Sequence, residues 1–209
     1  MKLLHAMIRV KNLDQAHEQT TRLFDTLNND GVELLGRIDV LVAGLKEHWI
    51  GEDGTKHINR LIDIHEKMQS FLSASLESTR EAMTSIVNLQ EVRRANGGGG
   101  QVGDIRPTVT DFQKSIARVE TTPEYYIDPS ITNDYKVLEE VEEKTKAFNS
   151  TFKAQRSELM ENWIDGSNRE TVQANFDEIE TLGAEAEKII AEVKQELNTS
   201  ITNAQQVME

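Results

Sequence analysis

The chain has 209 residues, of which 36 are acidic and 23 basic, so its formal net charge is −13. This charge disfavours binding to nucleic acid or anionic lipid, and the absence of cysteine excludes disulfide and thiol chemistry. No run of eighteen apolar residues occurs, so we expect no transmembrane helix. The charge is uneven, because residues 108–209 carry −11 and residues 1–107 only −2. An apolar content of 37% with 5% aromatic residues suits the narrow apolar stripes of packed helices.

Apolar residues at helical spacing predict a first long helix over about residues 7–48. We expect a kink or break at Asn28-Asn29-Asp30-Gly31, because asparagine and glycine lower helix propensity. A second helix is predicted over about residues 55–94. Together these elements predict a first helical hairpin over residues 1–94.

The turn of this hairpin is predicted at Trp49-Ile50-Gly51-Glu52-Asp53-Gly54. Gly51 and Gly54 can adopt a positive φ, which lets the chain reverse its direction. Asp53 or Thr55 can cap the helix that follows.

Residues 95–133 are predicted to connect the first hairpin to a second one. The run of glycines at Gly97–Gly100 indicates a flexible linker. A short extra helix is expected over about residues 111–119, capped by Thr110 or Asp111. Two prolines between residues 121 and 133 predict irregular backbone there.

The second hairpin is predicted over residues 134–209, with helices at about 134–162 and 167–207. Ser167 and Glu170 fit a capping box at the start of its second helix. Helices of this length are stable only when their apolar faces are packed. We therefore expect an all-α chain whose two long hairpins pack as an elongated four-helix bundle.

The two hairpins share one apolar pattern when the sequence is shifted by 114 residues, a shift that also places Trp49 on Trp163. The matching pairs are Phe24 with Leu138, Leu27 with Val141, Leu34 with Phe148, Ile38 with Phe152, Leu45 with Leu159, Ile58 with Val172, Ile62 with Phe176, Met68 with Leu182, Met83 with Leu197 and Val87 with Ile201. Their steps follow one helix face. This pattern predicts an internal duplication of the hairpin.

The order of helix, Trp-X-Gly turn and helix in this chain resembles that of the WXG (ESAT-like) family of type VII secretion substrates. Trp49-Ile50-Gly51 matches the family motif, whereas in Trp163-Ile164-Asp165-Gly166 the glycine comes one position late. The resemblance covers both hairpins and implies a fused pair, since these proteins are one hairpin long and dimerise as antiparallel four-helix bundles. It also implies a bacterial chain that is secreted without a cleaved signal peptide, or cytoplasmic before export.

Family members often carry a Tyr-X-X-X-Asp/Glu export signal after the second helix, and neither hairpin has one there. Tyr135 and Glu139 fit the pattern, but they open the third long helix. We interpret both as ordinary helix residues, with a weak export signal as the alternative.

Tryptophan and glycine at a hairpin tip allow two interpretations. Trp49 and Trp163 can close the ends of the bundle, with Gly51 and Gly166 allowing the turn. Alternatively, a tryptophan forms part of a docking groove, because tryptophan is enriched at binding hot spots. The sequence leaves both open.

Other motifs argue against catalysis or cofactor binding. Residues 98–103 match G-x-G-x-x-G, but a helix precedes them where a nucleotide-binding fold requires a strand. The five histidines lack metal-binding spacing, and no Glu-x-x-His pair for a di-iron bundle is present. No G-x-S-x-G nucleophile motif is present. We therefore expect no cofactor, no metal site and no enzymatic activity.

Two functions remain as expectations. The first is a partner-binding helical protein of type VII secretion, either exported itself or escorting an effector, as a monomeric pseudo-dimer or a homodimer. The second is an intracellular coiled-coil adaptor or scaffold with no role in secretion, since such proteins share this composition.

Overall fold

A computed structural model describes residues 8–97, 109, 112–166 and 168–208 of this chain and confirms the all-α class. The helical elements are α1 (Leu13–Asp25), the π-helical segment η1 (Thr26–Gly31), α2 (Val32–His48), α3 (Glu52–Ala95), α4 (Ile131–Asn162) and α5 (Arg169–Val207). The strands are short: β1 (Arg9–Val10), β2 (Trp49–Ile50), β3 (Tyr126–Ile127) and β4 (Trp163–Asp165). No helix in the described part of the chain is long and apolar enough to cross a membrane.

At the kink or break expected at residues 28–31 the helix does not end, because Thr26–Gly31 form the π-helical segment η1, in which the helix widens. The prediction that Asp53 or Thr55 caps the second helix is wrong, because that helix, α3, begins at Glu52 and therefore includes both residues. Gly51 has a positive φ of 134°, as predicted, whereas Gly54 lies within the helix and has none. Ser167 and the expected caps Thr110 and Asp111 lie outside the described residues.

Packing divides the chain into two compact units; α3, α4 and α5 each contribute a segment to both, whereas α1 lies in the first unit and α2 in the second. The first unit comprises Met1–Gly31, Phe71–Asp111 and Ser150–Glu180, and the second comprises Val32–Ser70, Phe112–Asn149 and Thr181–Glu209. Each predicted hairpin therefore contributes to both units.

The first unit is a four-helix arrangement with a buried apolar core, and polar contacts join neighbouring helices around it. Asp14 of α1 accepts hydrogen bonds from Gln90 and Arg93 of α3. Asn175 of α5 donates to Ser78 of α3 at 3.1 Å. Phe152 of α4 packs edge-on against Phe176 of α5, with ring centroids 5.4 Å apart, and both rings are buried.

The second unit again places α5 beside both α3 and α4. Arg37 of α2 pairs with Glu140 of α4 at 2.7 Å, and Lys194 of α5 pairs with Glu142 of α4 at 3.1 Å. Arg60 of α3 pairs with Glu192 of α5 at 2.5 Å. These pairs lie at the edges of an apolar core, so they fix which helix is adjacent to which and contribute little to stability.

Burial follows the predicted duplication closely. In nine of the ten pairs matched by the 114-residue shift both members are buried, and in the tenth, Val87 and Ile201, both are half-buried. The two hairpins thus direct equivalent faces inward, as the repeated apolar pattern predicts.

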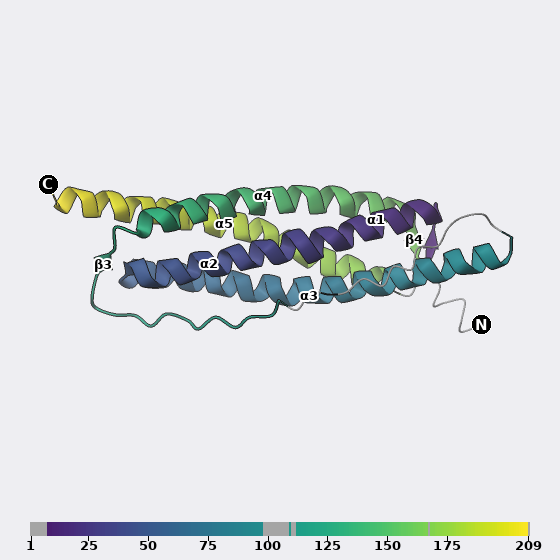
Figure 1. Ribbon diagram of the computed structural model, residues 1–209, viewed down its shortest axis with the longest axis horizontal. Helices are drawn as coiled ribbons and strands as arrows, with labels where there is room; N and C mark the ends of the chain where they lie inside the picture. The colour runs from purple at the N-terminus through teal and green to yellow at the C-terminus, as the bar shows by residue number, and fades with distance from the viewer. Residues whose placement is uncertain (1–7, 98–108, 110–111, 167, 209) are drawn as a thin grey trace. The chain divides into compact units, whose positions relative to one another are not determined.

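The connection between the hairpins contains a correction to the sequence prediction. The short helix expected over residues 111–119 is absent, because residues 112–125 have no helical structure. In the second unit they run as an extended strap beside α2 and the first half of α3 and then enter β3 (Figure 1). Of the expected glycine linker, Gly97 lies in a turn with a φ of 86°, and residues 98–108 are outside the described part.

Candidate partner-binding site at the hairpin tips and the strap

The tip of the first hairpin is built on Trp49, which is 1% exposed. Its ring stacks on His57 of α3, with centroids 5.8 Å apart and planes 5° apart. Gly54 lets the first turn of α3 approach this ring, since a Cβ there would lie 2.4 Å from the Trp49 carbonyl oxygen. The Trp49 Nε1 is buried and has no hydrogen-bond partner among the described residues.

The same tip is joined to the start of the second hairpin. β2 pairs antiparallel with β3, so that Trp49 lies opposite Ile127 and Ile50 opposite Tyr126. His48 Nδ1 lies 2.6 Å from Asp134 Oδ2, and a Cβ on Gly44 would collide with that carboxylate.

The contact between His48 and Asp134 shifts the pKa of both groups. The hydrogen bond to the Asp134 carboxylate raises the pKa of His48, whereas burial raises the pKa of Asp134. The Asp134 side chain is only 10% exposed, so its charge is poorly solvated and favours a protonated partner. The pair therefore tends to hold a proton on His48.

The tip of the second hairpin repeats this construction in the first unit. Trp163 is 1% exposed, and its Nε1 donates to the Asp165 carbonyl oxygen at 3.0 Å. β4 pairs antiparallel with β1, the segment that leads into α1. Asn162 occupies the position equivalent to His48, and its side-chain oxygen accepts from the Asn12 backbone N–H at 2.7 Å. Each hairpin tip therefore binds the segment that leads into the first helix of the other hairpin.

The late glycine of the second motif has a local explanation. β4 has three residues where β2 has two, and its pairing with β1 shifts register between Arg9 and Val10. The additional residue is accommodated as an irregularity of the β-bulge type. Gly166 then follows the strand with a φ of 140°, close to the 134° of Gly51 after β2. Both predicted turn glycines therefore take the conformation that the turn requires.

The burial of both tryptophans favours the interpretation that they close the tips. The aromatic surface of the first tip comes instead from Tyr125 and Tyr126, which are 57% and 50% exposed. Sequence reasoning missed these two tyrosines, because they lie in a stretch read only as irregular. Tyr135 and Glu139 lie in α4, half-buried and exposed respectively.

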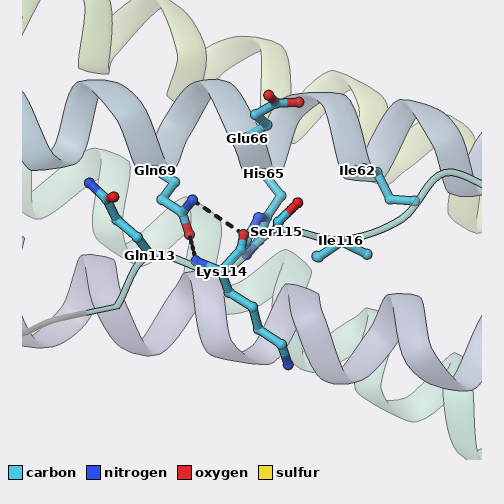
Figure 2. Close-up of a pocket in the computed structure, with 8 residues that line it drawn as sticks. All are labelled: Ile62, His65, Glu66, Gln69, Gln113, Lys114, Ser115 and Ile116. Carbon is cyan, nitrogen blue, oxygen red and sulfur yellow. Dashed lines mark hydrogen bonds between the residues drawn. The ribbon is translucent and has the colours of Figure 1, made fainter.

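Two amide side chains of α3 hold the strap by its backbone. The Asn59 amide accepts from the Val119 N–H at 2.8 Å and donates to the Val119 carbonyl at 3.0 Å. The Gln69 amide accepts from the Lys114 N–H at 2.8 Å and donates to the Lys114 carbonyl at 3.3 Å. Figure 2 shows the Gln69 pair beside His65, with Glu66 directed away from the strap.

The spacing of these two amide clamps accounts for the missing helix. Asn59 and Gln69 are ten helical residues apart, which corresponds to about 15 Å along α3. The five steps from Lys114 to Val119 span about 16 Å when extended but only about 7.5 Å as a helix. The strap also runs antiparallel to α3, so its backbone can satisfy both clamps only as an extended chain.

Opposite charges flank the clamped backbone. Lys114 pairs with Asp39 of α2, and Arg118 pairs with Asp63 of α3. Lys46 of α2 also donates to the carbonyl oxygen of Ala117. An acidic side chain of the groove thus faces each basic side chain of the strap.

The strap fills its groove incompletely. None of residues 112–120 is buried, and only Phe112, Ile116 and Val119 are half-buried. A cavity of about 290 Å³ lies between α3 and residues 113–116, and its lining includes the buried His65. A second space of about 400 Å³ lies beside Asn59, Asp63 and Arg118. The strap is therefore held by its backbone and its charges more than by apolar packing.

Comparison with known proteins adds no assignment. No family model matches this chain, and no curated protein or solved structure matches it. Its function has to be inferred from its own residues.

Proposed function

We propose that this chain is a non-enzymatic fused pair of WXG-like hairpins that binds another protein by helix packing in type VII secretion, as an exported substrate or as the escort of an effector. The observation that carries the proposal is the reciprocal pairing of the tips. β2 of the first hairpin pairs with β3 ahead of the second hairpin, and β4 of the second pairs with β1 ahead of the first.

This reciprocity is what two copies of a single hairpin protein would make across a two-fold axis. The repeated apolar register and the paired turn glycines, Gly51 and Gly166, support the same interpretation. A chain that carries both hairpins satisfies its own apolar seams, so a partner would contact its outer surfaces. The exposed Tyr125 and Tyr126 beside the first tip and the exposed Ile164 beside the second are candidates for that contact.

The test compares export in the source bacterium with and without its type VII secretion ATPase. The chain is followed by immunoblot in culture medium and cells, with a cytosolic protein as the control for lysis. We expect the chain in the medium of the parent strain only. Equal amounts in both media, or retention in the cells of the parent, would contradict the substrate role.

The escort role has a separate readout. A tagged chain that escorts an effector should co-purify with it from the cytosol of the strain that lacks the ATPase, where the complex accumulates. Retention in the parent strain together with no co-purified effector would favour the intracellular adaptor instead.

The export signal is tested by a matched pair of variants. Because Tyr135 and Glu139 lie within α4, we expect the Tyr135→Ala variant to be exported in the same amount as the control variant Lys136→Ala, which changes the exposed neighbouring residue. Loss of export in the tyrosine variant alone would instead assign a signal to Tyr135.

A further inference from the structure

We propose that the groove between α2 and α3 in the second unit is a docking site for an extended segment of a partner protein with basic residues four positions apart, and that residues 112–119 of the chain occupy it as an internal stand-in. The inference concerns the groove itself and holds whether or not the chain is exported.

The first argument is that the groove recognises a backbone. Asn59 and Gln69 each bind the N–H and C=O of a single strap residue, and these groups are present in any extended segment without proline at those positions. Amide pairs of this kind give affinity without restricting the side chains of the bound segment. The groove therefore accepts more sequences than the one that now occupies it.

The second argument is charge complementarity. Asp39 and Asp63 meet Lys114 and Arg118, so the groove selects two cations at positions i and i+4 of the bound segment. In an extended chain these two positions lie on the same side of the backbone, about 13 Å apart. A partner with lysine or arginine at this spacing would make the same two ion pairs.

The third argument is that the strap can be exchanged. It buries no residue completely, and both ion pairs of the strap are partly exposed, so each is worth little alone. Its attachment to the same chain adds to the clamps and the ion pairs, because it gives the strap a high effective concentration at the groove. The cavity that Ser115 lines, between the strap and α3, leaves room for a larger side chain at that position.

The probe is a fluorescein-labelled synthetic peptide with the sequence of residues 112–121, Phe-Gln-Lys-Ser-Ile-Ala-Arg-Val-Glu-Thr. It is titrated into the full chain and into Lys114→Glu/Arg118→Glu, in which the strap has lost both ion pairs. We expect the charge-reversed chain to bind the peptide at least tenfold more tightly than the unaltered chain. A peptide with glutamate at both basic positions should bind at least tenfold more weakly.

Matched changes on α3 test the clamps. In the charge-reversed background, Asn59→Ala/Gln69→Ala should weaken peptide binding at least tenfold, whereas Lys67→Ala, at an exposed position of the same helix, should leave it unchanged. Circular dichroism verifies that each variant keeps its helix content. If the charge reversal impairs folding, Lys114→Ala/Arg118→Ala serves the same test.

Hydrogen exchange at the backbone amides of positions 114 and 119 reports release of the strap, since both amides donate to the clamps. Faster exchange in the charge-reversed chain is expected. Unchanged exchange would overturn the proposal, because the strap would then not be held by its charges. Release of the strap without peptide binding up to about 1 mM would also overturn it, as would binding that does not depend on the clamps.

Discussion

The indole N–H of Trp163 donates a hydrogen bond and that of Trp49 is buried and has no partner among the described residues, so exchanging each tryptophan for phenylalanine compares these two states. Both side chains are 1% exposed, and the two substitutions therefore remove the same ring volume from equally buried sites.

The magnitudes follow from this difference. Losing the Trp163 hydrogen bond costs about 1 kcal/mol, whereas removing the unpaired N–H of Trp49 relieves a desolvation penalty of about 1–3 kcal/mol. The weaker stacking of phenylalanine on His57 offsets up to about 1 kcal/mol of that relief. We therefore expect Trp163→Phe to destabilise the chain by about 1–4 kcal/mol more than Trp49→Phe.

The assay is urea unfolding followed by circular dichroism at the helical band, which reports both units. Each variant also retains one tryptophan, in the unit that was not altered, and its fluorescence shows whether that unit unfolds at the same urea concentration. Equal losses in the two variants, or a larger loss for Trp49→Phe, would refute the reasoning from the hydrogen bonds.

Two further predictions concern the tip glycine and the histidines. Gly54→Ala should destabilise the chain by about 1–3 kcal/mol, because its Cβ would collide with the Trp49 carbonyl. Gly36→Ala, where a Cβ meets nothing within 4 Å, should stabilise it by up to about 1 kcal/mol, and urea titration of the pair checks the contrast. Burial lowers the pKa of His57 below 6.5, so the unfolded chain binds a proton that the folded chain resists, and stability falls as the pH drops below about 6.5. The raised pKa of His48 acts in the opposite sense, because its contribution is complete below pH 6.5 and is lost as the pH rises through that raised pKa. The unfolding free energy is therefore measured between pH 7 and 5.5 for each variant and for the unaltered chain. As the pH falls, it should decline less steeply in His57→Phe than in the unaltered chain, by up to about 1.4 kcal/mol per pH unit, and more steeply in His48→Gln. Slopes equal to that of the unaltered chain would contradict both assignments.

Helix periodicity predicted the parts of this fold that depend on burial. The 114-residue shift identified equivalent core positions because a duplicated apolar stripe must face the same interior in each copy. An irregularity of the helix at residues 28–31 was also predictable, since asparagine and glycine together weaken a helix, and it takes the form of the π-helical segment η1.

The strap and the cross-hairpin strands were not predictable in the same way. Phe112, Ile116 and Val119 have the spacing of a short amphipathic helix, and the extended form is imposed by contacts with distant residues, among them the amides of Asn59 and Gln69. Strands of two or three residues carry no periodicity, so the pairing of β2 with β3 had no sequence signal. The contact of His48 with Asp134 likewise depends on a fold-level meeting of residues 86 positions apart.

The irregular pairing of β4 with β1 at Ile164 has a consequence for how the sequence of such a tip can vary. The additional strand residue before Gly166 is compensated by one residue fewer between that glycine and Val172, so the helices on either side keep the 114-residue shift and stay in phase with their partners. A pattern search that requires tryptophan and glycine at one fixed separation would therefore find only one of the two tips of this chain. Allowing one or two intervening residues before the glycine would recover both tips.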